Sequence, residues 1–218
     1  QGYRYMLNIV VLVSGGGTNL QALLDAKAAG KIPNGEFVKV ISSKDGVYAL
    51  ERAKNSGVAT AVIERKGMTA EEFENALLGE LEASKADLIV LAGFMTILGE
   101  RVIEMYPEKI VNVHPALIPS FCGKGFYGLK VHEAALEYGV KVSGATVHFV
   151  NEIPDGGRII AQKAVDVLEG DTPETLQKRI MEQAEWKILP EAVAKLCDER
   201  KGIRFGLNGV HWQLASAL

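Results

Sequence analysis

The stretch NIVVLVSGGGTN, residues 8–19, decides the fold class of this chain. Residues 8–13 form an apolar run rich in β-branched side chains, which is typical of a buried strand. The run stops at three glycines, and leucines then recur with helical spacing at Leu20, Leu23 and Leu24. This order predicts a strand, a glycine loop and a helix, the first unit of a parallel sheet.

The same alternation of apolar runs and helical spacing continues along the chain. We expect further strands at residues 37–41, 60–63, 87–91 and 110–113, and further helices at residues 47–53, 70–81 and 98–105. Strands separated by helices imply right-handed crossovers, so the predicted fold class is α/β, with a mostly parallel twisted sheet and helices on both faces. In such sheets ligands bind outside the carboxyl ends of the strands.

After residue 130 the pattern changes. A helix up to Tyr138 is followed by two strands, at residues 143–150 and 158–167, which a turn joins. We therefore expect an antiparallel C-terminal hairpin next to the parallel strands, which makes the sheet mixed.

A long helix is expected from Pro173, with apolar residues at every fourth position and an interruption at Pro190. Weak alternation at residues 203–212 predicts a small hairpin. Because no repeat or long linker divides the chain, we expect one domain at residues 6–200, an N-terminal extension at residues 1–5 and a C-terminal tail at residues 201–218.

Composition narrows the class of protein. With 218 residues and 48% hydrophobic side chains the chain can bury a large core, and a net charge of −3 argues against a nucleic-acid partner. The longest early apolar run, residues 9–13, is too short to span a membrane, so we expect no membrane partner and a cytoplasmic location. Cys122 and Cys197 lack metal-ligand spacing, so we expect free thiols, no metal and a small-molecule substrate.

Asn112 and His114 stand two residues apart where an apolar strand ends. Side chains at this spacing project to the same side of a strand, and Pro115 and Pro119 stiffen the chain that follows. An amide donor beside an imidazole suits acyl chemistry, in which an oxyanion is stabilised while a proton moves. The alternative is a turn-forming asparagine beside a partly buried structural histidine.

The glycine loop at residues 14–19 offers backbone N–H groups at a helix N-terminus, where an anion such as phosphate binds. It is not the dinucleotide fingerprint, because Leu20 replaces the third glycine and residues 42–44 supply no acidic group. The alternative is a tight turn with a purely structural role.

Asp155 lies in the turn between the last two strands, where it could be a routine turn residue. If it folds over the sheet edge to His114, it would orient the ring and raise the pKa of the imidazole. His148, on an apolar strand, is expected to be a hydrogen-bonded structural histidine, and nothing elevates His132 or His211.

Four motifs carry a family resemblance: SGGGTN, LAGFM, NVHPALIPSF and GATVHFVNEIPDGG, in this order. Over residues 8–196 the chain resembles the phosphoribosylglycinamide formyltransferases, folate-dependent enzymes of purine synthesis in the wider formyltransferase group. The resemblance implies a Rossmann-like fold and formyl transfer from 10-formyltetrahydrofolate, as co-substrate, to phosphoribosylglycinamide, without a metal, by a monomer or homodimer. It also implies that His114 is the general acid, that Asn112 binds the formyl oxygen, and that Asp155 raises the histidine pKa and orders a water.

The resemblance further assigns two binding sites. The segments for the acceptor phosphoribosylglycinamide are Gly17, Thr18, Asn19, Glu182, Gln183, Ala184 and Glu185. The segments for the folate are Met95, Thr96, Ile97, Leu98, Asn112, Asn151, Glu152, Ile153, Pro154 and Asp155. Glu185 would accept a ribose hydroxyl, although its helical position alone predicts an exposed residue.

Two positions depart from well-known members, because Thr96 and Ala70 stand where those members carry basic residues. Arg65, Lys66 or Lys124 could hold the anionic folate tail instead. The glycine-rich segment 123–128 is either a loop that orders on binding or a plain surface loop.

Three other functions compete with this interpretation. A formyltetrahydrofolate hydrolase would keep the three catalytic residues and give the formyl group to water. That enzyme, and a methionyl-tRNA formyltransferase, would carry a further domain for which we expect no room. A non-catalytic nucleotide-binding module would need the glycine loop but would have no use for Asn112, His114 and Asp155.

Overall fold

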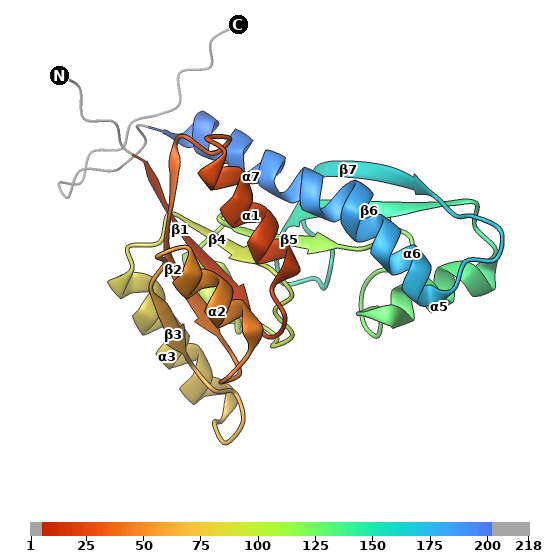
Figure 1. Cartoon of the computed structure of the whole chain (residues 1–218). Coiled ribbons are helices and arrows are strands. Elements are labelled where there is room, and N and C mark those ends of the chain that lie inside the picture. Colours follow the sequence, from red (N-terminus) through yellow and green to blue (C-terminus); the bar gives the residue numbers. More distant parts are fainter. Residues whose placement is uncertain (1–5, 202–218) are drawn as a thin grey trace, which may run out of the picture.

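The computed structural model describes residues 6–201, so the expected N-terminal extension and the expected hairpin at residues 203–212 lie outside the described residues. One mixed sheet of seven strands, in the order β3-β2-β1-β4-β5-β6-β7, organises the molecule (Figure 1). The strands are β1 (Leu7–Val13), β2 (Gly35–Ser42), β3 (Thr60–Val62), β4 (Leu88–Leu91), β5 (Ile110–His114), β6 (Val142–Phe149) and β7 (Ile159–Asp166). The first five strands are parallel, whereas β6 and β7 are antiparallel to their neighbours, which confirms the predicted fold class.

Helices cover both faces of the sheet. They are α1 (Thr18–Ala28), α2 (Tyr48–Asn55), α3 (Ala70–Ala83), α4 (Glu100–Met105), α5 (Leu129–Tyr138), α6 (Pro173–Ile180) and α7 (Trp186–Arg200), with a π-helical turn, η1 (Met181–Glu185), between the last two. In Figure 1 α7 runs beside α1 and α6 lies beside α5, so that α6, η1 and α7 together extend along the sheet.

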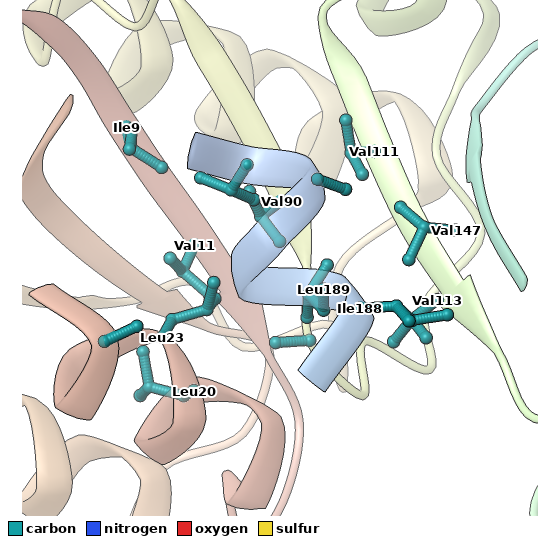
Figure 2. Packing of buried hydrophobic residues seen from close by; sticks show 14 of the residues in the cluster. Ile9, Val11, Leu20, Leu23, Val90, Val111, Val113, Val147, Ile188 and Leu189 are labelled. Carbon is teal, nitrogen blue, oxygen red and sulfur yellow. The ribbon is translucent and has the colours of Figure 1, made fainter. Parts of the chain in front are cut away.

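Alternate strand residues point into two separate cores, as the two-residue period of a strand requires. Val111 and Val113 of β5 belong to the larger core, where Ile188 and Leu189 of α7 pack in front of the strands (Figure 2). Ile110 belongs to the smaller core, under α3 and α4. Asn112 and His114, two and four residues after Ile110, therefore lie on the same face of the sheet as this smaller core.

The long C-terminal helix differs from the expectation at Pro190. This proline lies buried inside α7 without ending it, and the irregularity lies earlier, at η1. Apolar side chains spaced by four residues drift by about 40° per step around an α-helix. A π-turn, whose hydrogen bonds span one more residue, offsets that drift and keeps both halves of the helix facing the sheet.

The order of the strands brings the carboxyl ends of β1 and β4 together at the centre of the sheet. From there the chain leaves in opposite directions, because β2 flanks β1 while β5 flanks β4. Such a switch point is where open α/β sheets bind ligands. Within residues 6–201, no helix has the length and apolar character needed to cross a membrane.

Candidate active site

Three elements bring the predicted catalytic side chains together beside the end of β5. Asn112 and His114 share one face of that strand, and in the antiparallel register with β6 they stand opposite His148 and Thr146. The turn between β6 and β7 returns over this face and carries Asp155 to 3.6 Å from the His114 ring, measured from Oδ2 to Nδ1. Residues 112, 114 and 155 therefore form one cluster, and the meeting of Asp155 with His114 that the sequence left as a possibility is present.

The His114 ring faces an acceptor on each side. Its Nε2 donates to the backbone carbonyl of Phe121 at 2.7 Å, and its Nδ1 faces Asp155. Burial lowers the pKa of His114, while Asp155 and the Phe121 carbonyl oppose that effect, and the net shift is downward. Asp155 therefore raises the pKa of His114, as expected, but desolvation of the buried imidazolium outweighs the carboxylate and the net shift is downward.

The Asp155 carboxylate is held from several directions. The Gly123 N–H donates to Oδ2 at 2.8 Å, and Oδ1 lies 3.6 Å from Nε2 of His148. Burial raises the pKa of Asp155, but His148, the Gly123 N–H and His114 together hold it below its ordinary value. Asp155 also has a positive φ of 53°, an uncommon conformation for a residue with a side chain. The carboxylate is therefore ionised and fixed between two imidazoles.

His148 is part of this cluster, which the sequence did not reveal. Its Nε2 lies 3.2 Å from Nδ2 of Asn112, and its Nδ1 lies 2.8 Å from the carbonyl oxygen of Phe149. The β6–β7 register shifts between Val147 and His148. Bulges of this kind re-aim side chains next to active sites. The histidine is hydrogen-bonded, as expected, but its partner is the predicted catalytic amide.

The glycine loop lies at the switch point, between β1 and α1. Gly17 takes a left-handed φ of 78°, and a Cβ there would stand 2.7 Å from the Ala49 Cβ, so only glycine fits this corner. Behind the loop, Nδ2 of Asn19 donates to Oε1 of Glu185 at 3.3 Å. Asn19 Oδ1 and Glu185 Oε2 have no hydrogen-bond partner among the described residues. Two polar atoms are thus buried next to the glycine loop without the hydrogen-bond partners that buried polar groups usually have.

Glu185 is buried, with 5% of its surface exposed, which corrects the exposed position that helical spacing alone suggested. It ends the π-turn, and burial raises the pKa of its carboxyl to about 7. Ala184 is buried beside it, whereas Glu182 and Gln183 point to solvent and Glu182 lies 3.9 Å from Lys178. Of this expected acceptor segment, Glu185 is the residue whose hydrogen bond to Asn19 links it to the glycine loop.

The two expected folate segments lie at loops rather than in regular elements. The Met95 N–H donates to Ser14 Oγ at 3.0 Å, which ties the loop after β4 to the start of the glycine loop. Thr96 and Leu98 are partly or fully buried, whereas Ile97 is 91% exposed. In the other segment Asn151 accepts from the Ile153 N–H at 3.0 Å, and the three side chains that follow Asn151 are exposed: Glu152, Ile153 and Pro154.

The three basic residues expected to hold the folate tail differ in their surroundings. Lys66 and Lys124 are exposed, and Arg65 donates to the Met68 carbonyl. Both cysteines are free thiols, as predicted. His132 is fully buried on α5, and desolvation and the nearby His114 lower its pKa to about 4, so it is neutral. His211 lies outside the described residues.

A groove of about 890 Å³ runs between α1 and α7 and ends at Thr18, Gln21 and Arg52. None of its lining residues belongs to the His114 cluster, so it is a separate feature that adjoins the glycine loop. The part of the chain at residues 6–201 contains no group of three histidine, cysteine or acidic side chains arranged to hold a metal ion.

The comparison with known proteins agrees with this geometry. Residues 7–193 match the formyl transferase family model. This chain belongs to the formyl transferase family. The match spans β1 to α7 and includes the glycine loop, the His114 cluster and Glu185, so the resemblance predicted from the four motifs is confirmed.

Several formyl transferases are similar over most of this chain. The phosphoribosylglycinamide formyltransferase of Escherichia coli is 37% identical over 195 residues, which cover 89% of both chains. A crystal structure of glycinamide ribonucleotide transformylase 1 from Symbiobacterium toebii is 43% identical, with a TM-score of 0.84, over 92% of this chain and 91% of that one. The trifunctional purine biosynthetic protein adenosine-3 of Gallus gallus is 44% identical over 86% of this chain, which spans only 18% of that longer protein.

Proposed function

We propose that this formyl transferase moves the formyl group of 10-formyltetrahydrofolate to the primary amine of phosphoribosylglycinamide, in purine biosynthesis. The products are formylated phosphoribosylglycinamide and tetrahydrofolate. The observation that carries the proposal is the cluster of Asn112, His114 and Asp155 at the end of β5. The similar proteins from Escherichia coli and Symbiobacterium toebii bear names for this acceptor.

The cluster suits a tetrahedral intermediate. The amine attacks the formyl carbon, a C–N bond forms, and the formyl oxygen takes negative charge that the Asn112 amide and protonated His114 stabilise. The bond from the formyl carbon to the folate nitrogen then breaks. The attacking nitrogen loses one proton and the departing nitrogen gains one, through a water that the Asp155 carboxylate orders. Much of the rate comes from holding the two substrates together, worth roughly 7–11 kcal/mol for well-oriented reactants.

The acceptor is held at the other half of the site. Backbone N–H groups of Gly17, Thr18 and Asn19 face its phosphate at the N-terminus of α1. The unpartnered oxygen of Glu185 accepts a ribose hydroxyl. The folate lies between the segments at residues 95–98 and 151–155, where the exposed Met95, Ile97 and Ile153 supply apolar contact.

The wider setting is also proposed. Residues 6–200 act as one catalytic domain, with a monomer or a homodimer as the working form and no nucleic-acid partner. We place the protein in the cytoplasm. Fractionation of cells would test this location. Light scattering at assay concentrations would decide the oligomeric state.

The test follows loss of the formyl group from a 10-formyl folate spectroscopically, with and without phosphoribosylglycinamide. We expect turnover only with the acceptor, and a fall in kcat of about 10²–10⁴-fold in Asp155→Asn. Glu137→Gln, exposed on α5, is the matched carboxylate control and keeps full activity. Turnover without the acceptor would instead identify a hydrolase, and no turnover under either condition would overturn the proposal.

The pH profile adds an independent reading of the same variant. Activity needs protonated His114, so it falls as pH rises through the pKa of His114. Burial lowers that pKa and Asp155 raises it. In Asp155→Asn the fall therefore begins at lower pH than in the wild type.

A further inference from the structure

The carbonyl oxygens of the three glycines in the loop all accept hydrogen bonds from α1 or α2. The Ala49 N–H donates to Gly15 O at 3.2 Å, and the Gln21 N–H donates to Gly17 O at 2.9 Å. Between them, Nε of Arg52 donates to Gly16 O at 2.7 Å. Two of these donors come from α2 and one from α1, so the carbonyls face the helices.

The direction of a carbonyl sets the direction of the next N–H, because the two point opposite ways across a trans peptide. With the Gly15 and Gly16 oxygens turned to α2, the N–H groups of Gly16 and Gly17 point away from α2. Gly16 is exposed, and so is Thr18, where α1 begins. The loop therefore presents its donors to solvent at the place where an anion binds a helix N-terminus.

The guanidinium of Arg52 is itself fixed. It stacks over the Tyr48 ring at 4.7 Å, and Nη1 donates to Oε1 of Gln21 at 3.2 Å. Gly17 packs closely against the Arg52 side chain, since a Cβ at position 17 would stand 3.3 Å from Cδ of Arg52. A half-buried arginine with these restraints is a permanent positive charge at the edge of the loop.

We infer that Arg52 is a positioning residue for the phosphate of the acceptor. Through Gly16 O it holds the peptide that aims the Gly17 N–H at the phosphate, and its charge adds to the field of the α1 N-terminus. The inference rests on the proposed function, because it assumes an acceptor that carries a phosphate. Lysine would keep the charge but lose the flat, forked geometry that bonds Gly16 and Gln21 together.

The test compares Arg52→Gln, Arg52→Lys and the control Lys54→Met, which removes an exposed cation from the same helix. Each variant is assayed with phosphoribosylglycinamide and with the dephosphorylated riboside. We expect Arg52→Gln to raise KM for the phosphorylated acceptor about 10- to 100-fold, with kcat and the folate KM near the wild-type values. The constants for the riboside should not change, Arg52→Lys should be intermediate, and Lys54→Met should match the wild type.

A second readout avoids catalysis. Inorganic phosphate competes at the same subsite, so its inhibition or dissociation constant, measured by calorimetry, should weaken in Arg52→Gln in step with KM. Equal losses for the phosphorylated acceptor and the riboside, or unchanged phosphate binding in a folded variant, would overturn the inference. Failure of the wild type to transfer the formyl group would instead overturn the proposed function. The phosphate-binding measurement would still test whether Arg52 positions the phosphate.

Discussion

At the scale of single residues, one histidine fixes which way the Asn112 amide points. Nδ1 of His148 donates to the Phe149 carbonyl at 2.8 Å, which fixes the ring so that Nε2 faces both the Asn112 amide and Oδ1 of Asp155. Nε2 lies 3.2 Å from Nδ2 of Asn112, so the fixed ring holds that amide in place. In the proposed mechanism an N–H of that amide donates to the formyl oxygen. A side chain outside the reaction thus sets the orientation of one inside it.

Replacing His148 should therefore act on kcat. We expect His148→Phe to lower kcat about 10- to 100-fold, because a misaimed donor no longer meets the oxyanion, with both KM values little changed. His148→Gln, which keeps an acceptor, should lose less. Steady-state kinetics of these variants and of Asn112→Ala check this. A double variant much slower than Asn112→Ala alone would show that His148 acts by another route.

The buried carboxyl of Glu185 makes stability depend on pH. Burial raises its pKa from 4.5 to about 7, so the folded chain holds this proton more tightly than the unfolded chain. Its stabilising contribution is present below the unfolded pKa and is lost as pH rises through 7. We expect Glu185→Gln to match the wild type near about pH 4 and to be more stable by roughly 3 kcal/mol above about pH 8.

Denaturant unfolding at both pH values measures this difference. In the proposed site the Glu185 carboxylate accepts a ribose hydroxyl, so we expect the same variant to bind phosphoribosylglycinamide less well. A Glu185→Gln protein that is less stable than the wild type at about pH 8 would contradict the assignment of a costly buried charge.

At the scale of elements, the ends and the periodicity of helices explain which helix boundaries can be predicted from the sequence and which cannot. The start of α3 is predictable, because Thr69 and Glu72 form a capping box in which each side chain bonds the other's backbone N–H. The continuation of α7 through Pro190 cannot be predicted from the sequence, because proline usually breaks a helix. Here the π-turn before it keeps Ile188 and Leu189 against the sheet.

The capping box gives a stability prediction that is separate from the site. Thr69→Ala should lower the free energy of unfolding by about 1 kcal/mol, since the Glu72 N–H loses its acceptor. Thr69→Ser should retain most of it. Both should keep wild-type kinetics, because the His114 cluster makes no contact with this cap. Urea titration measures the change, and a loss of activity in Thr69→Ala would contradict the separation of α3 from the site.

At the scale of the whole molecule, the alternation of apolar runs and helical spacing was enough to predict the mixed sheet and the helices that cover both of its faces. It was also enough to place Asn112, His114 and the glycine loop at the carboxyl ends of strands. Pairs that depend on tertiary register could not be predicted, such as Asn112 with His148, which lie 36 residues apart. The Phe121 carbonyl that receives His114 is a backbone group, so no side chain signals it.

The same architecture predicts how the molecule opens. β1 and β4 are buried on both faces, with Ile9 and Val90 fully inaccessible, whereas β7 is an edge strand with mostly exposed side chains. We expect the slowest amide hydrogen exchange in β1 and β4 and fast exchange in the turn at residues 151–157. Peptide-level mass spectrometry measures this. Slower exchange in β7 than in β1 would contradict the central role of the parallel strands.

The bound carbonyls of the glycine loop also have a kinetic consequence. The peptides that follow Gly15, Gly16 and Gly17 do not have to rotate when the acceptor arrives, since their oxygens already have donors. The encounter should then be limited by diffusion and by attraction between opposite charges, and should slow as salt is added. We therefore expect capture of the nucleotide to be a docking event on a preformed surface, without a slow rearrangement of these glycine peptides.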